Sequence, residues 1–212
     1  MIKDYFYNDH FYKAIIKKKN DPRIIKEYKK ILKYKKMIKF VYQNKPLGTG
    51  DAVLKTKKYI KDKFFLMLLP DDLIIKKNCS KSMIKIHNRY NSSVMASMSV
   101  NHKTVSRWGI LKIKNKRKNY FQIDDVIEKP SVKNAPSNYA IIGRYILPYK
   151  IFDEIRKLKP KKGREVHITD AIRNIILKGD PFYANIFKGK YLDCGTLQGY
   201  INSGVEISKG IK

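Results

Sequence analysis

An α/β fold with a mixed, mainly parallel sheet flanked by helices is the fold class that this sequence predicts. The first observation is the order of elements: between residues 37 and 100, three strand-like segments alternate with two helical ones. The second is that the segments over 63–69 and 93–100 are apolar without alternation, which is typical of parallel strands buried on both faces. Strands that alternate with helices form layered sheets with right-handed crossovers.

Each element follows from a local pattern. Over residues 21–36, isoleucine, tyrosine and leucine share one face and lysines the other, which predicts a helix. The elements expected next, up to residue 100, are a strand over 37–42, a helix over 49–60, a strand over 63–69, a helix over 81–90 and a strand over 93–100. After residue 100 the links shorten, which favours antiparallel additions. The elements expected there are strands over 108–113, 120–128, 139–147, 182–187 and 191–196, and helices over 148–158, 169–177 and 197–207. Thr169 or Asp170 is expected to cap the helix that begins there.

The bulk composition indicates an ordinary globular protein. Its 212 residues are 43% hydrophobic, and no apolar run approaches the ~20 residues that span a bilayer. The start does not have the charged and then apolar pattern of a signal peptide. We therefore expect a cytoplasmic protein with no membrane association. With no internal repeat or low-complexity linker, we expect a single domain over residues 1–212.

The charge balance raises the question of nucleic-acid binding. The chain has 47 basic and 18 acidic residues, a net charge of +29, and clustered cations bind phosphates. However, most of these residues are lysine, and arginine is better suited to bidentate recognition of bases and phosphates. The lysines are also interleaved with isoleucine, tyrosine and asparagine along the whole chain. We expect no specific nucleic-acid partner and keep a basic nucleic-acid-binding protein as the least favoured alternative.

The cysteines and histidines have no metal-ligand spacing. Cys79 and Cys194 are far apart and match no disulfide framework or zinc motif, and the four histidines are equally scattered. We expect reduced thiols and no zinc site.

The most informative stretch is the loop and helix over 43–53, followed by a strand that ends in Asp71 and Asp72. Glycines at 48 and 50 allow a flat base or a phosphate to pack against bare main chain. An aspartate at a strand end can hold Mg²⁺. Ligands of open α/β sheets gather outside the carboxyl ends of strands. Each piece alone is also explained by an ordinary turn; the order of the pieces favours a site.

Other strand ends carry polar groups. Glu128 and Lys129 end one expected strand, and Asp193 stands beside a glycine at the end of another. A carboxylate can accept hydrogen bonds from sugar hydroxyls, and an ammonium can meet a phosphate. Taken alone, these are better explained as a surface ion pair and a turn. Gly109 and Gly143 lie within strands, where a bulge explains a glycine as well as a close ligand does.

Read in order, these segments resemble the bacterial UTP–glucose-1-phosphate uridylyltransferases of the sugar-phosphate nucleotidyltransferase superfamily. The matching segments are QNKPLGTGDAV (43–53), LLPDD (68–72), WGI (108–110), VIEKP (126–130), APSNYAIIGRYIL (135–147), EVHITDAI (165–172) and DCGTLQGY (193–200). The resemblance spans nearly everything after residue 40. It implies a Rossmann-like nucleotidyltransferase fold that transfers a uridylyl group from UTP to glucose 1-phosphate, giving UDP-glucose and pyrophosphate.

The resemblance also implies roles for individual residues. Asp71 and Asp193 would hold Mg²⁺, and Lys129 would meet the sugar phosphate and act with Asp71 in catalysis. The remaining implied contacts are to the uracil (Gln43 and Gly48), to the glucose (Gly109 and Glu128) and to the sugar-facing strand (Asn138 and Gly143).

One departure from the family pattern bears on activity. The family begins with a strand and a glycine-rich loop that holds the triphosphate, and residues 1–42 contain no glycine. The resemblance therefore implies a domain without its first strand and phosphate loop, acting alone, as a homo-oligomer or with a complementing N-terminal fragment. The alternative from another class is a catalytically inactive remnant or regulatory subunit that binds nucleotide sugars.

Overall fold

The computed structural model describes residues 2–158 and 165–210, and it divides the chain into two compact units. The helical unit comprises Met1–Asn44, and the core unit comprises Lys45–Lys212. Each unit is described here by itself. None of the described helices is both long and apolar enough to cross a membrane.

The helical unit contains three helices: α1 (Ile2–Tyr7), α2 (His10–Lys19) and α3 (Pro22–Lys35). The predicted helix over 21–36 is confirmed as α3. Asp21 caps it by accepting a hydrogen bond of 2.8 Å from the backbone N–H of Arg23, and Pro22 is its first residue. Both features are typical of helix starts, because proline has no N–H to leave unpaired there.

The strand predicted over 37–42 is wrong. After α3 the chain makes a turn and continues without strand pairing. A strand needs a partner to satisfy its backbone groups, and the described part of the helical unit contains no other strand that could pair with this segment. Gln43 lies in this extended segment, at the end of the helical unit, and is half-buried.

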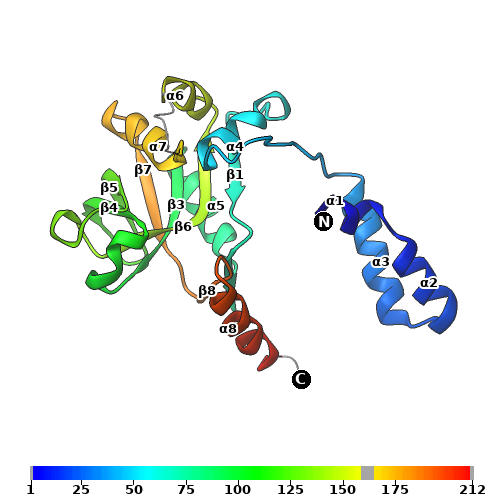
Figure 1. Cartoon of the computed structure of the whole chain (residues 1–212). Coiled ribbons are helices and arrows are strands. Elements are labelled where there is room, and N and C mark those ends of the chain that lie inside the picture. Colours follow the sequence, from blue (N-terminus) through cyan, green and yellow to red (C-terminus); the bar gives the residue numbers. More distant parts are fainter. Residues whose placement is uncertain (1, 159–164, 211–212) are drawn as a thin grey trace. The chain divides into compact units, whose positions relative to one another are not determined.

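The core unit is built on a six-stranded sheet with the order β1-β6-β3-β7-β5-β4, drawn in Figure 1. Its strands are β1 (Phe64–Leu68), β3 (Ser93–Ser99), β4 (Gly109–Lys116), β5 (Tyr120–Glu128), β6 (Tyr139–Pro148) and β7 (Phe182–Ile186). The second sheet is a ribbon of β2 (Asp72–Ile75) and β8 (Lys190–Asp193). The α/β class and the mixed sheet are confirmed.

The expectation of a mainly parallel sheet is wrong for the described strands. Only the pair β3–β7 is parallel there, and the other pairings are antiparallel. β6 enters between β1 and β3 and runs against both of them. β1 is an edge strand, and its Leu66 and Leu68 are exposed. A short apolar run shows that a strand is buried on one or both sides, but not the direction of its neighbours.

Helices cover both faces of the six-stranded sheet. The helices of the core unit are α4 (Thr49–Lys55), α5 (Cys79–Tyr90), α6 (Ile151–Lys157), α7 (Ile168–Leu177) and α8 (Leu197–Ser208), with short 3₁₀ turns η1 (Lys57–Tyr59), η2 (His102–Arg107) and η3 (Val132–Asn134). Alternation along β3 separates the two cores: Val94 and Ala96 pack with α5, whereas Met95 packs with the apolar face of α7.

The helix predicted over 169–177 begins slightly earlier, and its expected cap is wrong. Its N-cap is His167, whose side chain makes no capping bond. Instead, the hydroxyl of Thr49 accepts a hydrogen bond of 3.1 Å from the backbone N–H of Ile168. A free backbone N–H at the start of α7 is therefore capped by Thr49, the first residue of α4, and not by a residue of α7 itself.

The ribbon carries one predicted site residue, Asp193, at one end, and it places the other, Asp71, directly before its first strand. Asp72 pairs with Asp193 across the β2–β8 ladder. β8 leads directly into α8 in Figure 1, and Thr196 caps that helix by accepting from the N–H of Gly199. The ribbon and the end of β1 thus bring strand tips from distant parts of the chain together.

Candidate active site

The carboxylates of Asp71 and Asp193 converge on one point. The N–H of Cys194 donates to the carbonyl of Asp71 over 2.8 Å, which joins the two strand ends. A Cβ built on Gly195 would lie 3.1 Å from Oδ2 of Asp71 and 3.3 Å from Oδ1 of Asp193. Both oxygens therefore border the small space that glycine leaves open. The N–H of Gly195 also donates to Oδ1 of Asp193 over 2.9 Å, which orients that carboxylate.

Two convergent carboxylates fit a magnesium ion. Mg²⁺ is usually held by one or two carboxylates and completes its shell with water and substrate phosphates. No cluster of three or more histidine, cysteine, aspartate or glutamate side chains suited to a metal occurs among the described residues. The donor set at Gly195 therefore fits a hard cation shared with a phosphorylated substrate.

The Asp72 carboxylate fixes the position of the strand next to this pair through two hydrogen bonds. Its Oδ1 accepts a hydrogen bond of 2.5 Å from the hydroxyl of Tyr191, and its Oδ2 accepts one of 2.7 Å from the N–H of Gly143. A Cβ on Gly143 would overlap Asp72 and Leu69, so only glycine fits there. These bonds tie the tip of β2 to β8 and to the middle of β6.

Burial raises the pKa of the Asp72 carboxyl above its ordinary value, and the hydrogen bonds from Tyr191 and Gly143 oppose that rise. Burial, followed by the hydrogen bond to Asp72, raises the pKa of Tyr191. The tyrosine consequently remains protonated at neutral pH and is the donor.

A second cluster lies where β4 begins and β5 ends. Gly109 pairs with Glu128, and a Cβ on Gly109 would lie 3.2 Å from Oε2 of the glutamate. Lys129 follows in the left-handed conformation, with φ of 44°, and its N–H donates to the carbonyl of Trp108 over 2.9 Å. Within the described part of the chain, no carboxylate lies within ion-pair distance of the exposed Lys129 ammonium. Glutamate and lysine thus flank a glycine gap without neutralising each other.

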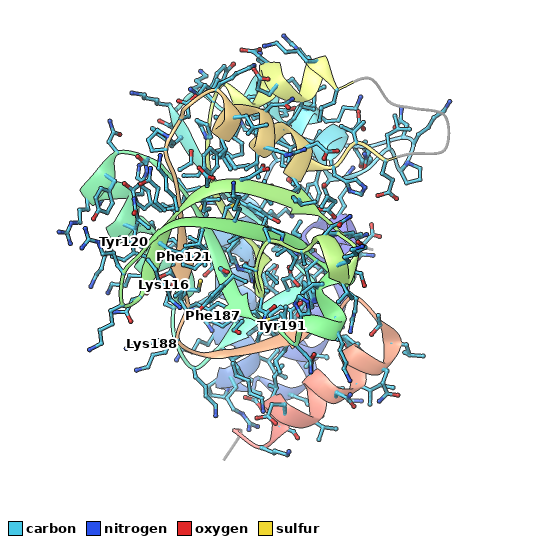
Figure 2. The ribbon with its side chains drawn as sticks, turned by 90° about the vertical axis from the view of Figure 1, so that its left-hand side faces the viewer. Lys116, Tyr120, Phe121, Phe187, Lys188 and Tyr191 are labelled. Atoms are coloured by element: carbon cyan, nitrogen blue, oxygen red, sulfur yellow. The ribbon has the colours of Figure 1, made fainter. Side chains whose placement is uncertain are left out.

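Side chains link the two clusters. The Arg107 guanidinium lies 3.4 Å from Oδ2 of Asp193. The ring of Trp108 packs edge-on against Tyr191, which Figure 2 labels, with ring centroids 5.8 Å apart. Between the clusters, burial raises the pKa of the Tyr145 hydroxyl, and the charges of Asp72 and Glu128 add to the rise. The two strand tips and the Gly109 cluster therefore border a common polar region.

The other predicted residues are placed as follows. Gly48 has a φ of 101°, and a Cβ there would lie 2.7 Å from the carbonyl oxygen of Val166, so the packing of the core unit alone requires glycine. The side-chain oxygen Oδ1 of Asn138 accepts a hydrogen bond of 2.7 Å from Nδ1 of His102. Gln43 belongs to the helical unit. Contacts of these residues with a substrate stay predictions.

The sequence reasoning missed Asp72, Tyr191 and Arg107. A signal existed for Tyr191, because residues two apart in a strand share a face and Asp193 was already a candidate. Asp72 was missed because the metal-binding role was assigned to its neighbour Asp71. Nothing in the local sequence of Arg107 shows that it meets a carboxylate 86 residues away.

Comparison with known proteins shows the family of the chain. The family model of the nucleotidyl transferases matches residues 5–210. The chain belongs to the nucleotidyl transferase family. The UTP–glucose-1-phosphate uridylyltransferase of Pseudomonas aeruginosa is 38% identical over 159 residues, which cover 74% of this nucleotidyl transferase chain. The chain spans 57% of the length of that relative.

Solved structures of UDP-glucose pyrophosphorylases share the fold. One, in its apo form, covers the whole chain with a TM-score of 0.86 and 30% identity, and the match takes up 78% of that structure. Another was solved in complex with UDP-glucose; it has a TM-score of 0.76 and 33% identity over 87% of this nucleotidyl transferase chain and 73% of that chain.

Replacing Tyr191 by phenylalanine tests the support of Asp72. Loss of a charge-assisted hydrogen bond should destabilise the nucleotidyl transferase chain by about 1.5–3 kcal/mol at pH 7. Because the folded-state pKa of Asp72 is already raised, its contribution to stability falls as the pH rises from the unfolded value through the folded one. In Tyr191→Phe the opposing hydrogen bond is absent, so stability should fall more steeply with rising pH than in the wild-type chain. The difference in unfolding free energy between the two proteins should therefore become smaller towards pH 4. Urea unfolding at several pH values measures it. Tyr149→Phe is the control, since its hydroxyl makes no hydrogen bond with described residues; equal deficits at all pH values would contradict the account.

The backbone of Lys129 gives a second prediction. A left-handed conformation favours glycine over other residues by about 1 kcal/mol. Lys129→Gly should therefore be more stable than Lys129→Ala by about 1 kcal/mol, although both variants lose the ammonium. Thermal unfolding of the two proteins side by side makes the comparison. Equal stability, or a more stable alanine variant, would show that the turn does not hold the left-handed conformation.

Proposed function

We propose that this chain transfers a uridylyl group from UTP to glucose 1-phosphate, giving UDP-glucose and pyrophosphate. The observation that supports the proposal most is the convergence of Asp71 and Asp193 over Gly195, next to the Gly109–Glu128–Lys129 cluster. The names of its relatives agree with this, and a structural neighbour was solved with UDP-glucose.

The proposed roles follow from the chemistry of each side chain. Asp71 and Asp193 would hold a divalent metal, whose use is general in this family. We propose Mg²⁺, which would neutralise negative charge on the phosphates when bound. Glu128 would accept hydrogen bonds from glucose hydroxyls in the space beside Gly109. Lys129 would hold the sugar phosphate, because its ammonium is exposed and no carboxylate of residues 2–158 and 165–210 lies within ion-pair distance of it.

The reaction itself requires alignment more than covalent help from the protein. An oxygen of the glucose phosphate would attack the α-phosphorus of UTP, and the bond from that phosphorus to the bridging oxygen of the β-phosphate would break. Pyrophosphate would leave with the electron pair of that bond. Lys129 would orient the attacking oxygen, and fixing two reactants in this way supplies a large part of the rate enhancement.

Few residues of the chain are assigned to nucleotide binding. We propose that Gln43 and Gly48 contact the uracil, and that Asn138 and Gly143 border the sugar. Residues 1–42 contain no glycine that could form a phosphate-binding loop. The backbone N–H groups of a phosphate-binding loop donate hydrogen bonds to the triphosphate, and each donor of this kind contributes roughly 3 kcal/mol to charge stabilisation. We therefore expect the chain alone to use UTP weakly.

Neutralising either carboxylate tests the function. Asp71→Asn and Asp193→Asn should each lower the rate of UDP-glucose formation by about 100-fold or more, because each removes a negative ligand while keeping its shape. The control is Asp62→Asn, which makes the same chemical change on an exposed residue outside the site. Pyrophosphate release from UTP, glucose 1-phosphate and Mg²⁺ measures the rate.

The same assay distinguishes the proposal from the inactive alternative. UDP-glucose binding without turnover by the wild-type chain would contradict catalysis and favour a nucleotide-sugar-binding protein. Full activity in both site variants would show that the carboxylates are not the metal ligands.

A further inference from the structure

A cavity lies along helix α5, on the opposite side of the sheet from α7. It has a volume of about 540 Å³ and is bordered by α5, the turn between β4 and β5, and the segment that follows β7. Figure 2 shows Tyr120 and Lys188, from two of these walls, on the same side of the molecule. Its basic residues are Lys77, Lys81, Lys85, Arg89 and Lys188, and no aspartate or glutamate lines it.

These cations have no acidic partners. In residues 2–158 and 165–210, none of the five makes an ion pair within 4.0 Å, although Arg89 lies over the ring of Tyr90 at 5.5 Å. A similarly basic cavity beside α4 and α6 is different. There Lys55 pairs with Asp51, and Lys57 and Arg156 both pair with Asp153. No aspartate or glutamate of the described residues lines either cavity, but neighbouring carboxylates pair with three of the five basic residues of the cavity beside α4. The cavity along α5 differs from it because, within the described chain, none of its five basic residues is paired in this way.

The spacing of the basic residues on α5 is unfavourable for the helix alone. Lys81, Lys85 and Arg89 are four residues apart and form a single row over about 12 Å of helix. Like charges at this spacing repel one another and destabilise a helix. An anion bound along the row would offset that repulsion.

The two ends of the cavity differ in chemistry. At one end, the start of α5 adds the positive end of the helix dipole to Lys77 and Lys188, and Asn78 caps the helix there. At the other end, the cavity is walled by Tyr90 and Tyr120, whose hydroxyls share a hydrogen bond of 2.6 Å. Tyr90 is held in place by stacking on Tyr183, with ring centroids 4.4 Å apart.

We propose that this cavity binds the phosphate chain of a small polyphosphate, either free or carried by a nucleoside. A row of unpaired cations on a rigid helix matches several linked phosphates better than a single carboxylate or phosphate. The volume is within the range of small-molecule sites. The tyrosine wall offers a surface for a base if the phosphate chain belongs to a nucleotide. The site uses none of the residues assigned to uridylyl transfer, so it does not rest on that function.

The test is binding of inorganic tripolyphosphate and of ATP to the full chain, measured by calorimetry in EDTA at ~0.15 M salt, where weak non-specific attraction to phosphates is reduced. All proteins keep Asp71 and Asp193, because in EDTA these carboxylates have no metal and repel phosphate, which disfavours binding at the proposed active site. The variant is Lys81→Gln with Lys85→Gln. Its control is Lys58→Gln with Lys61→Gln, which makes the same charge change in the cavity beside α4.

We expect tripolyphosphate binding that becomes weaker by about tenfold or more in the α5 variant and changes less than twofold in the control. Tighter binding of ATP than of tripolyphosphate would identify a nucleotide as the source; equal binding would identify free polyphosphate. Lys188→Gln should weaken binding without altering α5, and so tests the site if the double variant unfolds. Equal weakening by both double variants, no binding, or tighter α5-dependent binding of a single-stranded oligonucleotide would overturn the proposal.

Discussion

The hydrogen bond from Cys194 to the carbonyl of Asp71 joins two strand ends that are more than a hundred residues apart in the chain. The short β2–β8 ribbon holds these two strand ends side by side, and its antiparallel pairing places Asp72 opposite Asp193. Without it, the two carboxylates would belong to separate loops with no fixed separation. With it, their oxygens face one space that Gly195 leaves open. Two negative groups held this close repel each other, which is tolerated where a cation completes the site.

The ribbon is in turn anchored to the main sheet through Asp72. Its two oxygens accept hydrogen bonds from Tyr191 and from the N–H of Gly143, so this carboxylate acts as a structural support, whereas its neighbour Asp71 faces the space at Gly195. Trp108 packs on Tyr191 at the point where β4 begins. The geometry of the carboxylate pair and that of the Glu128–Lys129 cluster therefore depend on the same small group of contacts. In the proposed reaction, this common support would allow residues from separate strands to act on the same pair of substrates.

The sequence predicts most elements and the strand-end candidates, because helix periodicity, apolar runs and the positions of Asp71, Glu128 and Asp193 are local features. It fails where tertiary contacts decide. The apolar run over 63–69 was expected among parallel strands, yet β1 is an edge strand that pairs with β6 in the antiparallel sense. The cap of α7 comes from Thr49, and the partner of Arg107 from β8. The cavity along α5 was equally invisible, since Lys188 is distant in sequence from the helix and the chain is rich in lysine throughout.

The central claim is that Asp71 and Asp193 bind one divalent cation together across Gly195. Electron paramagnetic resonance of Mn²⁺ titrated into the chain with UTP tests it directly. We expect one bound Mn²⁺ per chain, with affinity lowered by about tenfold or more in Asp71→Asn and in Asp193→Asn, and unchanged in Asp62→Asn. Mn²⁺ affinity that is equal in the wild-type chain and in both site variants would contradict the account.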